Sequence, residues 1–149
     1  MTADDRSVED LSIQCDVDLV RDPLEAAFAK REPAPSKSGV TATTVVNLRS
    51  TEESISMFDA SYLIAEFAEG SCLVDIVHGW ELSRIVRETS VTTRWEDGIL
   101  RIDSTRVLYD EPDEGEAEEE PRCERLSYRV TDGRFTRLGR ESSAGACPK

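Results

Sequence analysis

Four arginines near the C-terminal end of this chain have spacings that would place them on one face of a β-ribbon. The segment Cys123–Leu138 has the pattern of two strands that turn at Asp132-Gly133, a dipeptide suited to the positive φ angles of a type I′ hairpin. With Thr131 opposite Arg134, the arginines point away from the apolar side chains. The four are Arg125, Arg129, Arg134 and Arg140. Clustered guanidinium groups bind phosphates, carboxylates and acidic surfaces, so we expect this face to bind a small anionic ligand or a protein partner.

A strongly acidic segment precedes this ribbon and offers the arginines an internal partner. Asp110–Pro121 has eight acids and no base, which leaves −5 of the net charge of −13 for the rest of the chain. Its residues cannot form a core, so we expect a mobile loop over residues 110–121. The alternatives to an anion site are therefore a solvated edge and a set of arginines covered by this loop. The net negative charge argues against nucleic acid and anionic membranes as partners.

The four cysteines are far apart in the sequence. They are Cys15, Cys72, Cys123 and Cys147, and no two are closer than 24 residues. This spacing excludes a zinc ribbon and a C-x-x-C redox motif. An even number of widely spaced cysteines indicates two disulfides in an oxidising compartment. We expect the pairs Cys72–Cys123 and Cys15–Cys147; the other connectivities, and four free thiols, are the alternatives.

The remaining residues with reactive side chains do not form a catalytic or metal-binding pattern. His78 is the one histidine and shares the phase of neighbouring apolar residues, so we expect a structural, hydrogen-bonded side chain. Cys72 precedes it on the same predicted strand, about 20 Å away and too far for a Cys–His nucleophilic pair. The acidic segment departs from the calcium-binding EF-hand pattern at Pro112 and Pro121. We therefore predict no catalytic residue, no metal site and no cofactor.

The clearest structural element is a hairpin over Ser90–Asp103 that turns at Asp97-Gly98. One of its faces is mainly apolar, and the other carries charges of both signs. The inward face carries Val91, Thr93, Trp95, Leu100 and Ile102, and the outward face carries Thr92, Arg94, Glu96, Ile99, Arg101 and Asp103. Because the outward charges can neutralise each other, we interpret this hairpin as scaffold.

Elements before this hairpin are also mostly strands. Val40–Leu48 is rich in β-branched residues, and Tyr62–Ala65 with Cys72–Val77 suits a second hairpin. Asp22-Pro23 followed by Glu25 has the composition of a helix start, which predicts a short helix near residues 23–31. The fold class expected is mainly β, bordering on α+β: a single antiparallel sheet or flattened barrel of about seven strands in hairpin order.

The expected organisation is one domain between two tails. Residues 1–10 form a flexible N-terminal tail, 11–138 a single β-rich domain, and 139–149 a C-terminal tail. The sequence shows no membrane-spanning segment and no leader pattern, which fits either a cytosolic chain or a mature chain whose Met1 replaces a leader. We expect a periplasmic or secreted, disulfide-stabilised module that binds or supports other molecules without catalysis. The alternatives are a cytoplasmic acidic adaptor or chaperone-like protein with free cysteines, and an unrecognised hydrolase.

Overall fold

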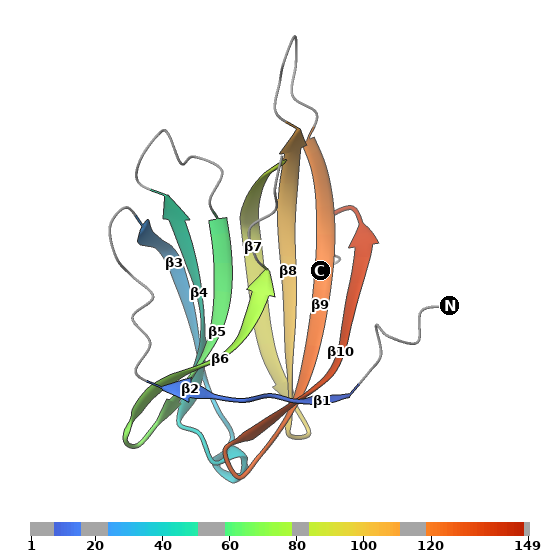
Figure 1. Ribbon diagram of the computed structural model, residues 1–149. Coiled ribbons are helices and arrows are strands. Elements are labelled where there is room, and N and C mark those ends of the chain that lie inside the picture. The colour runs from blue at the N-terminus through green and yellow to red at the C-terminus, as the bar shows by residue number, and fades with distance from the viewer. Residues whose placement is uncertain (1–7, 16–23, 51–58, 79–83, 111–118, 148–149) are drawn as a thin grey trace.

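The computed structural model describes residues 8–15, 24–50, 59–78, 84–110 and 119–147, most of which lie in β-strands (Figure 1). The strands form two five-stranded antiparallel sheets. The spatial order in sheet A is β1 (Glu9–Asp10), β10 (Arg134–Ala144), β9 (Glu119–Thr131), β8 (Ile99–Asp110) and β7 (Arg84–Glu96). The order in sheet B is β2 (Gln14–Cys15), β6 (Gly70–His78), β5 (Asp59–Phe67), β4 (Ala42–Ser50) and β3 (Leu24–Pro33). Among these residues, the helical segment is the short 3-10 turn η2 (Ser36–Ser38).

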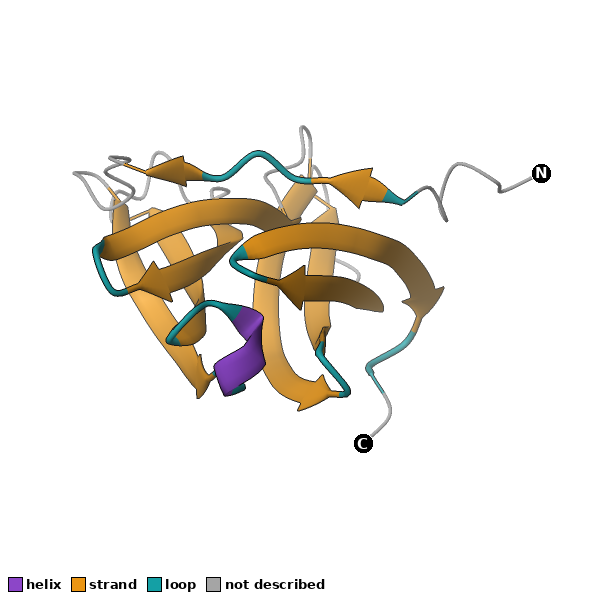
Figure 2. Ribbon diagram, turned by 90° about the horizontal axis from the view of Figure 1, so that it is seen from below, coloured by secondary structure: helices purple, strands orange, loops and turns teal. Residues whose placement is uncertain are grey.

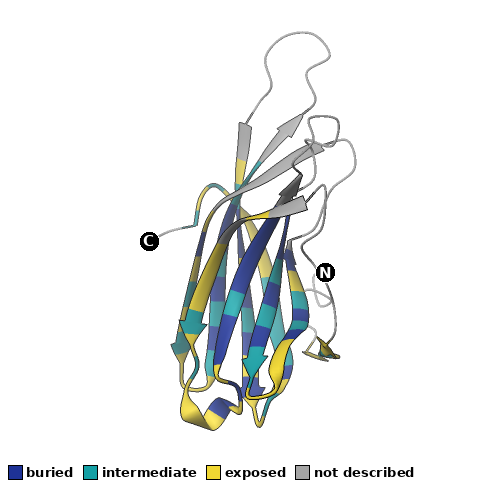
Figure 3. Cartoon of the chain, turned by 90° about the vertical axis from the view of Figure 1, so that its left-hand side faces the viewer, coloured by how far each residue is buried: buried dark blue, intermediate teal, exposed yellow. Residues whose placement is uncertain are grey.

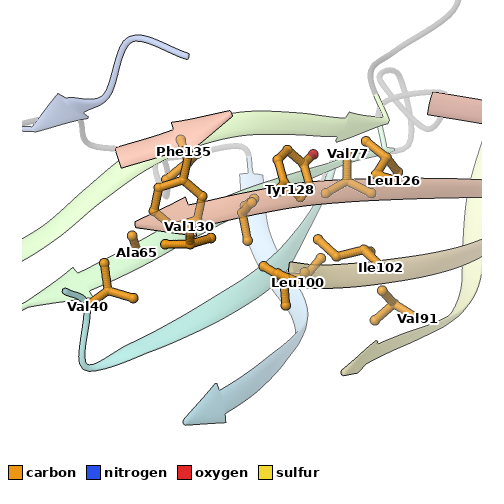
Figure 4. Packing of buried hydrophobic residues seen from close by; sticks show 13 residues of the cluster. Val40, Ala65, Val77, Val91, Leu100, Ile102, Leu126, Tyr128, Val130 and Phe135 are labelled. Atoms are coloured by element: carbon orange, nitrogen blue, oxygen red, sulfur yellow. The ribbon is translucent and has the colours of Figure 1, made fainter. Parts of the chain in front are cut away.

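The two sheets pack face to face and enclose one hydrophobic core, so the mainly β prediction is confirmed (Figure 4). Buried residues alternate with more exposed ones along much of β6, β8 and β9, as a half-buried antiparallel sheet requires, whereas β4 is buried on both faces (Figure 3). The largest core side chains that are fully buried come from both sheets: Tyr128, Phe135, Leu100, Ile102 and Leu126 from sheet A, and Leu63, Val45 and Val77 from sheet B.

Both Asp-Gly hairpins form where the sequence predicts them. At Asp97-Gly98 the φ angles are 51° and 77°, and at Asp132-Gly133 they are 52° and 76°. These left-handed conformations are those of a type I′ turn, which Asp-Gly adopts readily. Trp95 lies opposite Leu100, and the apolar faces of both hairpins turn towards the core, as predicted. The hairpin predicted between Tyr62 and Val77 is also present, as β5 and β6.

The helix predicted near residues 23–31 is wrong. Leu24–Pro33 is strand β3, which pairs antiparallel with β4. A helix of two to three turns is not stable by itself. The conformation of this segment therefore depends on the element that it packs or pairs with, and not on its helix-start composition. Here the partner is β4, whose β-branched residues favour an extended neighbour.

The predictions of a single sheet and of about seven strands are also wrong. The strands between Leu24 and His78 hydrogen-bond to one another, and those between Arg84 and Ala144 do the same. The sheet therefore breaks between β6 and β7, and the chain folds back to make the second layer. Two layers bury the apolar face of each sheet, which one open sheet leaves in water. The short strands β1 and β2 complete the two sheets.

The segment Glu9–Cys15, which we call the strap, joins the two sheets along one side of the sandwich (Figures 1 and 2). Strand β1 pairs with β10, and β2 pairs with β6. Between them, Leu11 and Ile13 pack against the core, and the Leu11 N–H donates to the Phe135 carbonyl at 3.0 Å. The strap begins inside the segment predicted as an N-terminal tail, and β10 continues to Ala144, beyond the predicted boundary at residue 138.

Both predicted disulfide pairings are wrong, although all four cysteines are paired. The Sγ atoms of Cys15 and Cys72 lie 2.06 Å apart, and those of Cys123 and Cys147 lie 2.11 Å apart. Cys15 is directly opposite Cys72 in the β2–β6 ladder of sheet B, whereas Cys123 is on β9 of sheet A. The two cysteines that we predicted to join central strands therefore lie in different sheets. The N–H of Cys147 donates to the hydroxyl of Thr105, which lies opposite Cys123.

Arginines of β10 cap the edge of β6 that β2 leaves unpaired. Strand β2 pairs with β6 at Cys72 and Leu73 alone. Beyond that point Arg140 donates to the carbonyl oxygens of Ile76 and Val77, at 2.7 and 2.9 Å. Arg137 donates to both carboxylate oxygens of Asp75, at 3.1 and 2.8 Å. Charged groups on a free sheet edge oppose pairing with a strand of another chain.

The buried hydroxyl of Tyr128 donates to Asp75 at 2.8 Å and makes the fold sensitive to alkaline pH. Burial, together with the charge and hydrogen bond of Asp75, raises the pKa of Tyr128 well above its usual value. Because this pKa is higher in the folded state, the stabilisation is complete below about pH 10 and declines above it, where the unfolded chain ionises first. Urea unfolding across alkaline pH should show this decline, and the Tyr128→Phe variant should show a shallower one. Equal declines in the two proteins would contradict this assignment.

Candidate anion-binding face

Three of the four arginines predicted to share a face do so, and the fourth does not. The exposed three, on the outer face of sheet A, are Arg125, Arg129 and Arg134. The β9–β10 ladder follows the predicted register as far as Arg137. A shift between Arg137 and Gly139 then places Arg140 opposite Leu126, towards the buried side of the sheet. The predicted register at Arg140 is therefore wrong, because a bulge moves every later residue to the other face.

Arg140 instead belongs to a charged cluster between the sheets. Besides its bonds to β6, it donates to the carboxylate of Glu124 at 2.8 Å. Glu124 is 5% exposed and also accepts from Arg106. Arg137, on the same strand as Arg140, contacts Asp75 and the more exposed carboxylate of Glu9. Burial lowers the pKa of Arg137, but the hydrogen bond and charge of Asp75, with the charges of Glu9 and Tyr128, outweigh burial and raise this pKa overall. Apart from Arg140, no sequence pattern above pointed to these residues. The strand alternation could have revealed Glu124, because it places this residue on the same buried face as Leu126 and Tyr128. A charge on a buried face needs a partner of opposite charge.

The first hairpin contributes two more arginines to the outer face of sheet A. Strand β8 pairs with β9, so Arg101 lies opposite Ser127, and Arg94 lies opposite Arg101 on the adjacent strand β7. We call the outer face that carries the five residues Arg94, Arg101, Arg125, Arg129 and Arg134 the arginine face. The interpretation of the first hairpin as scaffold therefore missed its contribution to this face, because sequence patterns do not show which hairpins lie side by side.

The arginine face has a central hollow of about 330 Å³ whose cations already have carboxylate partners. Arg94 lies 2.9 Å from the carboxylate of Glu96, which is 3.6 Å from Arg101. Arg125 lies 3.7 Å from the carboxylate of Asp103. A ligand anion in this hollow would have to compete with these carboxylates for the arginines. We therefore expect the hollow to bind anions weakly.

A second depression, the basal groove, lies where the strap passes the β9–β10 turn and has a volume of about 750 Å³. Arg129 and Arg134 line it, and within the described part of the chain neither forms an ion pair. Arg129 lies opposite Thr136, and Arg134 lies opposite Thr131, so the two arginines are diagonal neighbours. Diagonal Cα atoms are about 7–8 Å apart, within reach of long side chains. The two guanidinium groups can therefore both donate hydrogen bonds to one ligand anion.

The acidic segment 110–121 cannot neutralise these two arginines. Its ends are held where Tyr109 lies opposite Glu119, at the far end of β9 from Arg129. Ten residues of strand separate Glu119 from Arg129, a distance of about 33 Å. Eight residues anchored at both ends reach about 14 Å from their anchors. The alternative in which the loop covers the arginines is therefore disfavoured for Arg129 and Arg134; residues 111–118 themselves lie outside the described residues.

Other candidate residues add no site. Cys72 and Cys123 are both in disulfides, so neither sulfur is a free thiolate for a Cys–His pair. The side chain of His78 lies outside the described residues, whereas Trp95 packs against the core. In the part of the chain that is described, no three His, Cys, Asp or Glu residues are grouped to hold a metal ion. No helix there is long and apolar enough to span a membrane.

Comparison of the chain with protein-family models, with curated proteins and with solved structures found no match.

Proposed function

We propose that this chain is an exported, disulfide-stabilised β-sandwich that acts by binding an anion or acidic partner on the arginine face, without catalysis. The observation that carries the proposal is the pair Arg129 and Arg134, exposed in a groove and without an ion-pair partner among the described residues. Exposed guanidinium groups without an ion-pair partner can donate charge-assisted hydrogen bonds to a carboxylate or phosphate of a ligand.

The disulfides support the exported location. All four cysteines are paired, and disulfides persist in oxidising compartments such as the periplasm and the cell exterior. The cytoplasmic adaptor considered above needs free cysteines, and the described structure offers none. No observation favours a hydrolase over a binding protein.

Replacing Arg129 and Arg134 together by serine should weaken binding of acetate and inorganic phosphate at least about tenfold, because each charge-assisted hydrogen bond contributes about 1.5–3 kcal/mol. The measurement is a titration of ¹⁵N-labelled protein, followed through the Nε–Hε signals of the arginines and the amides of β9 and β10.

The matched control is the Arg94→Ser/Arg101→Ser variant, which removes two arginines of the same face that already have carboxylate partners. This variant should bind both anions as the unmodified chain does. Equal losses in the two variants would mean that net charge, not the Arg129–Arg134 pair, governs binding. Binding that survives the Arg129→Ser/Arg134→Ser change would show that the face is only solvated surface.

A further inference from the structure

The basal groove continues along the strap into a second depression. This second depression has a volume of about 600 Å³ and lies beside the β5–β6 turn, where Phe67 and the Cys15–Cys72 disulfide line it. Ile13 of the strap lines both depressions, so they meet at this residue. We call the combined depression the strap groove. Figure 2 shows the strap running beside β6 and β10, the strands that follow the β5–β6 and β9–β10 turns.

The two ends of the strap groove differ in chemistry. At the sheet A end are the guanidinium groups of Arg129 and Arg134. At the sheet B end the lining includes Phe67 and Ile13, two partly buried side chains that pack against the core. Five residues of extended strap, from Asp10 to Cys15, span about 17 Å. The end with the two arginines, which we call the cationic end, also contains Asp10 and Asp132. The end with Phe67 and Ile13, which we call the apolar end, also contains Glu69. The groove has the length of an elongated small molecule.

The carboxylates at the cationic end limit the charge of a suitable ligand. Asp10 and Asp132 also line the basal groove. Asp10 accepts a hydrogen bond from the hydroxyl of Thr136 at 2.9 Å, so this carboxylate is held by a neutral partner and leaves the arginines free. With two arginines and two aspartates in the lining, a second negative charge on the ligand gains about as much repulsion as attraction. A carboxylate, whose two oxygens match the planar fork of a guanidinium group, fits these conditions better than a phosphate dianion.

We propose that the strap groove binds a free, elongated monocarboxylate with an apolar body, such as a fatty acid. The carboxylate lies between Arg129 and Arg134, and the apolar chain follows the strap past Ile13 towards Phe67. This inference rests on the proposed function and adds the ligand class to it. Apolar contact along the groove supplies affinity, while the two arginines determine the orientation of the ligand.

The test compares three probes by NMR titration of the ¹⁵N-labelled chain: octanoate below its micelle-forming concentration, acetate and 1-octanol. Octanoate should bind at least about tenfold more tightly than acetate or octanol, because each buried methylene adds to the affinity. Octanoate should shift the signals of Arg129 and Arg134 and also the amides of Gly70 and Ser71, whereas acetate should shift the arginine end alone.

Two variants separate the ends of the groove. Ser71 is exposed on the lining of the apolar end, so the Ser71→Trp variant fills that end without disturbing the core. It should reduce octanoate affinity to that of acetate and leave acetate binding unchanged. The Arg129→Ser/Arg134→Ser variant should bind both octanoate and acetate at least about tenfold more weakly.

Each alternative result overturns the inference in a distinct way. Equal affinities for octanoate and acetate, both dependent on the two arginines, would overturn the fatty-acid inference and leave the proposed anion binding intact. Equal affinities for octanoate and octanol, with octanoate binding unchanged in the Arg129→Ser/Arg134→Ser variant, would indicate apolar contact alone. This result would also overturn the fatty-acid inference. No dependence of any carboxylate on Arg129 and Arg134 would overturn both proposals.

Discussion

Replacing Cys15 and Cys72 together by alanine should lower the free energy of unfolding by about 4 kcal/mol in the chain-entropy model of cross-links. The bond joins cysteines 57 residues apart in the sequence, so its loss gives the unfolded chain much more freedom. It also holds β2 against β6 and closes one end of the strap. Urea unfolding followed by tryptophan fluorescence measures the change.

The second disulfide is the internal control for this prediction. Cys123 and Cys147 are only 24 residues apart in the sequence. The free energy of unfolding of the Cys123→Ala/Cys147→Ala variant should therefore fall by a smaller amount, about 3.5 kcal/mol. A reversed order, or no loss in either variant, would contradict the loop-length argument.

Thiol titration of the same variants under denaturing, non-reducing conditions tests the pairing itself. Each double variant should show no free thiol, because its two remaining cysteines are partners. Two thiols in the Cys15→Ala/Cys72→Ala variant would mean that Cys123 and Cys147 bond elsewhere.

The Glu124→Gln variant should lose about 3 kcal/mol of stability. Glu124 has a side chain only 7% exposed and contacts Arg106 and Arg140, with the latter at 2.8 Å. Removing the negative charge leaves two guanidinium groups in the sandwich without their common carboxylate. Breaking a buried ion pair from one side costs about 3–5 kcal/mol, and the glutamine oxygen retains part of the hydrogen bonding. Urea unfolding of the purified variant measures the loss.

Glu66→Gln is the matched control, with the same chemical change on the outer face of sheet B. The Arg31 hydrogen bond lowers the pKa of Glu66, and the two side chains are 2.8 Å apart. Because Arg31 is 54% exposed, solvent screens this pair, and its loss should cost no more than about 1 kcal/mol. Similar losses in the two variants would show that burial of Glu124 does not set the cost.

Local sequence signals predicted the hairpins well. Asp-Gly at two positions and the alternation around each predicted both turns, and most inward and outward residues followed. These features depend on near neighbours in the chain: the φ preference of the turn residues and the two-residue period of a strand. The same period placed Arg129 and Arg134 on the outer face before any tertiary contact was known.

Errors occurred where the outcome depended on distant residues. The helix near residues 23–31 had good local signals, but pairing with β4 decided the conformation. The phase of Arg140 changed at a bulge between Arg137 and Gly139, which alternation alone does not locate. The disulfide partners of Cys72 and Cys123 depended on which sheet each strand joined.

The sequence alone determined the β class, the two Asp-Gly hairpins and the outward position of Arg125, Arg129 and Arg134, because each depends on a local backbone preference. The tertiary structure decided the division into two sheets, the disulfide pairing and which arginines form no ion pair with another described residue. It also brought the strap against the β9–β10 turn to form the groove. These features depend on pairing and packing between residues far apart in the chain, and a strand's pattern shows which face is buried but not what buries it.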